Sequence, residues 1–205
     1  VTAGNASSIN DGGAAVVLCD GGYAKAQGLK PLARVVAYAT GSVEPKMLFF
    51  APITAVKNLL AVQGVGIDHF DLIEINEAFA SQTLADGKAL GWNWDKVNVN
   101  GGAIALGHPI GCSGAFIATK ALYELQRING RVAVRIHAKH IAPKGGHQRV
   151  NVIRGACQTH AKLHIPRGLQ CLSHGFHLSP GCRGHRDERC IVEESQAFHR
   201  PGQAV

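Results

Sequence analysis

Residues 98–114 read NVNGGAIALGHPIGCSG, a stretch that combines five glycines with one histidine, His108. Glycine lets the backbone approach a ligand closely and adopt positive φ angles, and Pro109 stiffens the turn behind the imidazole. Apolar side chains at helical spacing follow from Ser113 to Arg127. The stretch therefore predicts a turn that presents His108 at the start of a helix. The alternative is a purely structural strand-to-helix turn, in which His108 only caps the structure.

Strand-like and helix-like segments alternate along residues 1–136, which is typical of a layered α/β protein. Short apolar runs predict strands at 14–19, 32–38, 70–75, 97–99 and 131–136. Hydrophobic spacing and terminal glycines predict helices at 23–27, 54–63, 77–90 and 113–127. Asn76 lies between an expected strand and an expected helix, a position that also suits a helix N-cap.

The composition changes near residue 136. Residues 1–136 hold 11 Lys and Arg against 10 Asp and Glu, whereas residues 137–205 hold 10 against 4, with nine of the eleven His and four of the six Cys. The second segment has no sustained hydrophobic period and can bury little apolar area per ordered residue. We therefore expect a domain at 1–136 and an irregular basic tail at 137–205.

The gross features of the chain exclude some classes of protein. Charged and polar residues interrupt every apolar run before it reaches the length of a membrane span, so we expect a soluble protein. The net charge of +7 lies mostly in the tail and does not point to a nucleic-acid surface on the domain. The chain starts at Val1 without a basic and apolar leader, and we expect it to be a fragment of a longer protein.

The stretch around His108 resembles the active-site signature of the thiolase family, with every Gly and with His108, Pro109 and Ser113 in place. Two further segments are similar to thiolases. VTAGNAS at 1–7 with NDG at 10–12 resembles the loop at the start of their C-terminal domain, and NEAFA at 76–80 resembles their Asn-Glu-Ala-Phe motif. Order and spacing agree over roughly residues 1–133. The resemblance implies a layered α/β domain with a mixed five-stranded sheet.

This resemblance implies acyl transfer between CoA thioesters in two covalent steps, either Claisen condensation of acetyl-CoA or thiolysis of 3-ketoacyl-CoA. It assigns to His108 the activation of a nucleophilic Cys and donation to the thioester oxygen, and to Asn76 a water that completes the oxyanion site. Ser7 would contact the pantetheine arm of CoA. Ala78 and Phe79 would line the same tunnel, although core packing is an alternative for Phe79.

The family resemblance also bears on partners and location. It implies acyl-CoA and CoA as partners, a homo-oligomer in the intact family, and no metal or organic cofactor beyond the CoA substrates. We expect neither a nucleic acid nor a membrane as partner, and a cytoplasmic location, or a mitochondrial or peroxisomal one in a eukaryote. Residues 47–52 occupy the place of a loop that shapes the acyl pocket, where Phe49 and Phe50 would either narrow the pocket or pack in the core.

The chain departs from the family at the two cysteines that carry the covalent and proton-transfer steps. The nucleophile belongs to the N-terminal domain of thiolases, and Ala138 falls in the place of the second cysteine. Cys112 lies four residues from His108, but the motif assigns it no chemistry, and Cys19 in an expected strand is a small core residue. We therefore expect this chain alone to be inactive.

Two other interpretations stay open at this stage. The chain could be a truncated or frameshifted product without enzymatic activity. It could also bind a metal or a nucleic acid through its tail, although the spacing of the candidate zinc ligands matches no standard Cys/His pattern. These candidates are Cys171, His174, His177, Cys182, His185 and Cys190.

Overall fold

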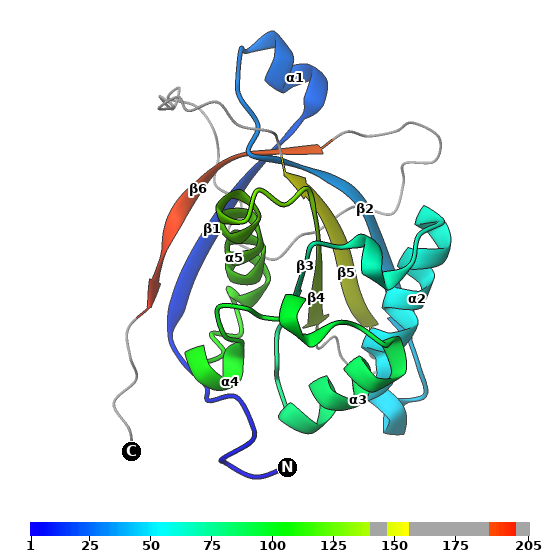
Figure 1. Ribbon diagram of the computed structural model, residues 1–205. Helices are drawn as coiled ribbons and strands as arrows, with labels where there is room; N and C mark the ends of the chain where they lie inside the picture. Colours follow the sequence, from blue (N-terminus) through cyan, green and yellow to red (C-terminus); the bar gives the residue numbers. More distant parts are fainter. Residues whose placement is uncertain (140–146, 156–188, 200–205) are drawn as a thin grey trace.

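The computed structural model describes residues 1–139, 147–155 and 189–199, and their strands form one mixed sheet with helices on both faces (Figure 1). The strands are β1 (Gly12–Asp20), β2 (Ala33–Ser42), β3 (Leu72–Ile75), β4 (Val132–Lys139), β5 (His147–Gly155) and β6 (Arg189–His199). The helices are α1 (Gly21–Ala26), α2 (Ala51–Gln63), α3 (Ala80–Leu90), α4 (Ala103–Leu106) and α5 (Ser113–Arg127). Short 3-10 helices are η1 (Pro45–Phe50), η2 (Ile67–His69) and η3 (Trp94–Lys96).

The six strands follow the order β1-β6-β2-β5-β4-β3. Strands β3 and β4 run parallel, and the other neighbouring pairs are antiparallel. A parallel pair needs a long crossover connection, and α3, α4 and α5 form it here. This crossover begins with Asn76, directly after β3, and contains the glycine-rich stretch that leads into α5. The fold thus brings the two predicted site segments to the same connection.

Two strands lie where the sequence predicted an irregular tail, so that prediction was wrong for their residues. Strand β5 pairs with β2 and β4 at once, and β6 pairs with β1 and with the start of β2. The predicted five-stranded sheet therefore has six strands. Pairing satisfies backbone N–H and C=O groups without a regular hydrophobic period, which is why the local pattern did not reveal these strands. Residues 140–146, 156–188 and 200–205 lie outside the described part.

Other predicted elements changed their bounds. The strand expected at 97–99 is only an isolated bridge between Ile73 and Val97. The helix expected from residue 77 begins at Ala80, because Glu77 has a φ of 58° that no helix accommodates. The helix expected at 113–127 has those bounds in α5. The predicted domain boundary at residue 136 falls inside β4, and the division into two domains stays a prediction.

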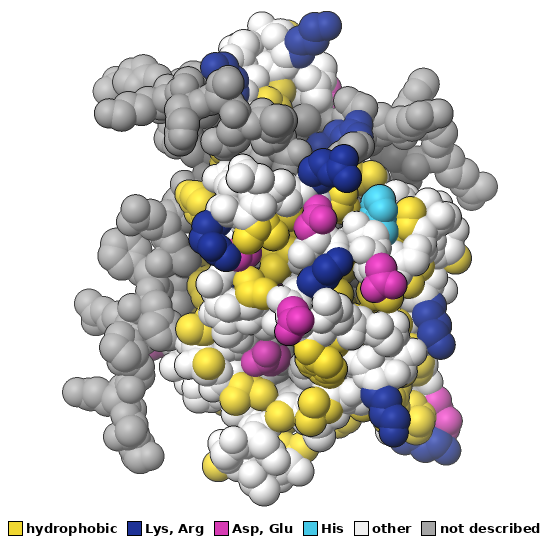
Figure 2. Space-filling model, viewed as in Figure 1, with side chains coloured by type: hydrophobic (Ala, Val, Ile, Leu, Met, Phe, Trp, Pro, Cys, Tyr) yellow, Lys and Arg dark blue, Asp and Glu magenta, His cyan; other side chains and the backbone are white. Residues whose placement is uncertain are grey.

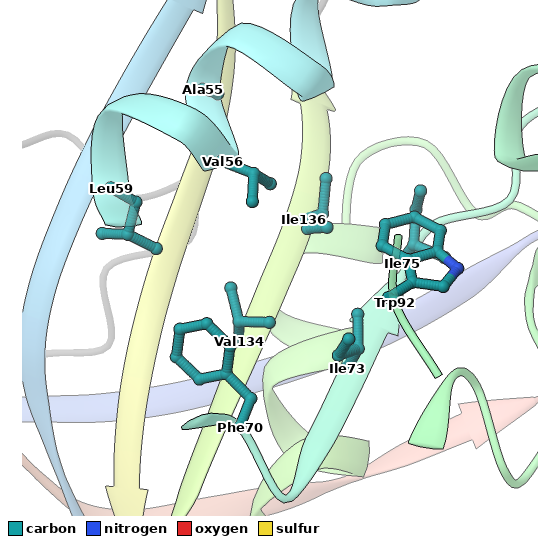
Figure 3. Packing of buried hydrophobic residues seen from close by; sticks show 9 residues of the cluster. All are labelled: Ala55, Val56, Leu59, Phe70, Ile73, Ile75, Trp92, Val134 and Ile136. Carbon is teal, nitrogen blue, oxygen red and sulfur yellow. The ribbon is translucent and has the colours of Figure 1, made fainter. Parts of the chain in front are cut away.

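The hydrophobic core lies on both faces of β3 and β4 because successive side chains of a strand point to opposite faces. One cluster packs beneath α2 and joins Ile73, Ile75, Val134 and Ile136 to helix residues such as Leu59 (Figure 3). The second cluster packs beneath α5. It consists of Ala33, Leu72, Ala118, Ala121, Leu122, Leu125 and Ala133. The helices α2 and α5 therefore clamp the parallel pair from either side.

The stretch Pro45–Gln63 is apolar and long enough, by composition alone, to cross a membrane, a test that buried core helices also pass. Its first part is η1, and Met47 has non-helical angles of −103° and 15°. In α2, Ala55, Val56 and Leu59 are fully buried against the sheet. We therefore interpret α2 as a core helix of this domain.

The charged side chains on one face of the molecule are of both signs. Figure 2 shows Lys and Arg interleaved with Asp and Glu and with small apolar patches over this face. Charges of both signs interspersed in this way are typical of a solvated protein surface. The charge on this face therefore agrees with the near balance of residues 1–136 in the sequence.

Asp86 of α3 is a carboxylic acid in the interior. Its side chain is fully buried, and neither carboxyl oxygen has a hydrogen-bond partner among the described residues. Burial raises the pKa of Asp86 from 3.8 to about 7, because the interior disfavours the charged form. The folded protein therefore holds this proton more tightly than the unfolded chain does.

We predict that Asp86→Asn stabilises the protein in a pH-dependent way. Below the unfolded pKa of 3.8 both states bind the proton, and the variant and native proteins differ little. As the pH rises to about 7 the native protein loses stability relative to the variant, by up to about 4 kcal/mol at about 1.4 kcal/mol per pKa unit. Urea unfolding from acid to neutral pH measures this difference, with the exposed Asp95→Asn as control. A difference that does not change with pH would contradict the assignment.

Candidate functional site

Asn76 continues the parallel pairing beyond the end of β3. Its backbone N–H donates to the carbonyl of Ile136 at 3.1 Å, and its carbonyl accepts from the N–H of Ala103 at 3.1 Å. The residue is 5% exposed. Phe79 occupies the N-cap position of α3, so the interpretation of Asn76 as a helix cap was wrong. Both backbone groups are thus fixed, which leaves the side-chain amide for other partners.

The side-chain amide of Asn98 holds the backbone around Asn76. Its Oδ1 accepts from the N–H of Ile75 at 2.8 Å, and its Nδ2 donates to the carbonyl of Ile75 at 2.8 Å and to Oε1 of Glu77 at 2.6 Å. Asn98 itself has a φ of 46°, a conformation that Asn tolerates better than most residues. Asn98 therefore fixes the residues on either side of Asn76.

The contacts of Asn98 around Asn76 also require a glycine at residue 102. A Cβ atom at residue 102 would collide with the carboxyl group of Glu77 and the amide of Asn98. Only glycine lets the loop pass so close to these side chains. The sequence placed Asn98 and Gly102 in the signature stretch but gave neither of them a role, since both contact Glu77, which lies more than twenty residues away.

The N-terminal segment holds the loop that carries His108. The backbone N–H of His108 donates to the carbonyl of Ser8 at 2.8 Å, and Ile9 forms a parallel bridge with His108. Gly107 has a φ of 90°, and a Cβ there would collide with the side chain of Asn10. The two segments that resembled thiolases separately in the sequence are therefore in direct contact.

His108 is bonded at both ring nitrogens. Its Nε2 lies 3.3 Å from Nδ2 of Asn76, and its Nδ1 lies 2.7 Å from Oγ of Ser113. The hydroxyl of Ser113 in turn donates to the carbonyl of Pro109 at 2.9 Å. Because this donation uses the only hydroxyl hydrogen, Ser113 accepts from Nδ1–H of His108. These partners assign the neutral tautomer with hydrogen on Nδ1 and a lone pair on Nε2.

The residues predicted to contact CoA lie together on one side of this site. The backbone N–H of Ser7 donates to the carbonyl of Ala78 at 3.0 Å, and Ala6 pairs with Phe79 in an isolated bridge. Ser7, Ala78 and Phe79 are all half-buried. Their role in binding stays a prediction.

Aromatic side chains extend from Phe79 to the surface. The rings of Phe49 and Phe79 meet edge to face with centroids 5.2 Å apart. Phe49 and Phe50 are 46% and 41% exposed, so core packing does not account for them. The apolar surface next to Ala78 and Phe79 is thus formed by η1.

The structure describes the side chains of two cysteines, Cys112 and Cys19. Cys112 is half-buried and packs close to the backbone at Gly12. Burial raises the pKa of its thiol, which disfavours the nucleophilic thiolate. Cys19 lies in a strand, β1, as expected, but it is only half-buried and belongs to neither core cluster, so the expectation of a core residue was wrong. Ala138 lies in β4, opposite Gln148 of β5, and supplies no thiol.

Residues 1–139, 147–155 and 189–199, as far as their side chains are described, contain no group of three or more His, Cys, Asp or Glu that could hold a metal ion. Five of the candidate zinc ligands of the tail lie outside the described residues. These are Cys171, His174, His177, Cys182 and His185. Cys190 lies in β6, where the structure describes the backbone alone.

Comparisons with known proteins agree with this arrangement. The family model described as thiolase, C-terminal domain, matches residues 29–154, more than half of the chain. The chain belongs to the thiolase family. Acetyl-CoA acetyltransferase of Pseudomonas aeruginosa is 53% identical over 127 residues, which are 62% of this chain and 32% of that protein. Beta-ketothiolase BktB of Cupriavidus necator is 52% identical over 134 residues, which are 65% of this chain and 34% of that protein.

Solved structures show the same relationship. The human mitochondrial 3-ketoacyl-CoA thiolase in complex with CoA is 35% identical, with a TM-score of 0.66 over 77% of this chain and 39% of that one. The thiolase chain described here therefore spans about a third of the length of the curated relatives it matches. The expected membership of the thiolase family is confirmed, and the layered α/β domain is confirmed in its coarse form.

We predict that Asn98→Asp destabilises the fold and the site together. The substitution keeps the size of the side chain but turns an oxygen toward the carbonyl of Ile75 and the carboxylate of Glu77, where Nδ2 now donates. The expected loss in the free energy of unfolding is about 3 kcal/mol. Chemical denaturation at neutral pH measures it.

The matched control for this prediction is Asn93→Asp. Asn93 is exposed, and its side chain only accepts a hydrogen bond, from the N–H of Asp95 at 2.9 Å. A carboxylate accepts equally well, so the control should unfold like the native protein. Equal stability of Asn98→Asp and the control would show that the donor bonds of Asn98 are unimportant.

Proposed function

We propose that this chain is the C-terminal part of a thiolase-type acyltransferase and supplies the histidine and asparagine that act on a CoA thioester. The observation that carries the proposal is the adjacency of Nε2 of His108 and Nδ2 of Asn76, 3.3 Å apart. Family membership and the names of the relatives support it. Since the matched segment covers only 32% of such a relative, the complete reaction is a proposal for the whole protein.

In this proposal His108 acts first as a base. The assigned tautomer carries a lone pair on Nε2, which can take the proton of an acyl-accepting thiol as that sulfur attacks the thioester carbon. The imidazolium that results has hydrogen on both nitrogens. Its new Nε2–H can then donate to the thioester oxygen as negative charge develops there. Donation from Nε2 thus follows proton uptake.

Ser113 holds the ring throughout this sequence, whereas the Asn76 amide must turn its N–H away from Nε2 when that nitrogen takes up the proton. Nδ1–H of His108 donates to Ser113 in the neutral ring and in the imidazolium alike, so the ring stays oriented throughout. The amide of Asn76 is held by a rigid backbone and donates toward the same region, directly or through a water. An amide stabilises the oxyanion without a fixed countercharge that would bind the ground state as well.

The proposal assigns the acyl-accepting cysteine to a segment outside residues 1–139. Within that range Cys112 is packed away with a raised pKa, and Ala138 stands where the family has its second cysteine. The pantetheine arm of CoA would run along Ser7, Ala78 and Phe79. This placement is supported by their common position beside the His108 site and by the likeness to a thiolase solved with CoA.

We expect the purified chain to bind CoA, which calorimetric titration measures. Ser7→Asp adds a negative charge to the half-buried surface where the anionic CoA would lie, and it should weaken binding about tenfold or more. Val62→Asp adds the same charge at an exposed position of α2 and should bind like the native chain. Absence of CoA binding, or equal binding by the Ser7 variant, would contradict the placement.

We also expect the purified chain to show no thiolysis of acetoacetyl-CoA above the buffer rate, because neither covalent step has its thiol within residues 1–139. Loss of absorbance of the 3-ketoacyl-CoA measures the reaction. Turnover by the native chain that disappears in His108→Ala would show that a sulfur of this chain does reach the site, and would overturn this part of the proposal.

A further inference from the structure

Helix α5 holds both ends of the loop that carries His108. At the end of the loop, Ser113 is the first residue of α5 and bonds to the imidazole. At its beginning, Nζ of Lys120 donates to the carbonyl of Gly101, and Nδ2 of Asn100 donates to Oε2 of Glu124 at 2.8 Å. Lys120 and Glu124 are four residues apart and lie on the same side of the helix. The loop is therefore anchored to one rigid element at two places.

The same lysine also reaches the strand that leads to Asn76. Nζ of Lys120 lies 2.9 Å from Oε2 of Glu74, which is in β3 two residues before Asn76. The side chain of Glu74 is fully buried, and that of Lys120 is 12% exposed. One ammonium thus connects the helix that orients His108, the loop that carries it and the strand that carries Asn76.

The Lys120 ammonium acts on the buried carboxyl group of Glu74 against the effect of burial. Burial raises the pKa of Glu74, the Lys120 ammonium opposes that rise, and the carboxylates of Glu77 and Glu124 reinforce it. A buried ion pair contributes little to stability compared with apolar side chains of the same size, but it fixes the positions of both partners. The carbonyl of Gly101 adds a third fixed point.

We propose that Lys120 is a positioning residue: its ammonium, shared between Glu74 and the carbonyl of Gly101, sets the separation of His108 and Asn76. The inference rests on the proposed function, which gives His108 and Asn76 their role in acting on a thioester. Its test measures the order of the loop directly. A failure to bind CoA would therefore refute the proposed function but not the positioning role of Lys120.

The test compares four variants with the native chain. Lys120→Met removes the ammonium, and Lys120→Arg keeps the charge and the donors. The double variant Glu74→Gln with Lys120→Met removes both charges, which avoids leaving a buried carboxylate unpaired and preserves folding. Lys46→Met is the control, because it breaks an exposed ion pair with Glu44, 3.0 Å away, with the Lys side chain 74% exposed.

The measurements are amide hydrogen exchange by mass spectrometry and the nitrogen NMR shifts of the His108 ring. We expect residues 98–107 to exchange about tenfold faster in Lys120→Met and in the double variant, while α2 exchanges as in the native chain. The His108 shifts should move in both variants, and Lys120→Arg should restore the native pattern. The control should behave as native.

Two results would overturn the proposal. One is native exchange of the loop and native His108 shifts in a folded variant without the ammonium. The other is an equal acceleration of the loop and α2, since that pattern reports a general loss of stability and no specific positioning.

Discussion

The site depends on the side-chain amide of Asn98, which bonds to the backbone of Ile75, the last residue of β3. A strand that ends in the interior leaves backbone groups that need partners, and Asn98 bonds to both groups of Ile75. Its third bond reaches Glu77, so Asn76 is fixed from both sides. The positive φ angles of Asn98 and Glu77 and the glycine at 102 belong to the same set of contacts. The backbone that carries Asn76, the proposed oxyanion residue, is therefore fixed by these contacts.

The imidazole side is built by α5. Ser113 is the first residue of the helix and fixes Nδ1 of His108, while Lys120 and Glu124 hold the beginning of the loop further along the same helix. The apolar stripe of α5 is buried against β3 and β4, so the helix cannot move independently of Asn76. The packing of α5 in the core therefore also aligns His108 with Asn76. The described part of the chain thus orders His108 and Asn76 by itself.

The sequence predicted what local patterns control. Helix α5 has the predicted bounds because its apolar period and its start are local features, which neighbouring residues of the sequence reveal. The start of α3 was misplaced because the conformation of Glu77 depends on Asn98 and Gly102. Strands β5 and β6 were missed because their partners are distant strands and their own side chains show no period. Asn76 and His108 are 32 residues apart, and only the family resemblance brought them together beforehand.

The central claim is that the resting His108 carries its hydrogen on Nδ1 and presents the lone pair of Nε2 beside Asn76. Nitrogen NMR of the labelled native chain, with the His108 ring assigned by its loss in His108→Gln, tests this claim directly. The account predicts a pyrrole-type shift for Nδ1 and a pyridine-type shift for Nε2, and mixing of the two forms in Ser113→Ala. A native ring with hydrogen on Nε2 would contradict the account, because His108 could not then accept the thiol proton at that atom.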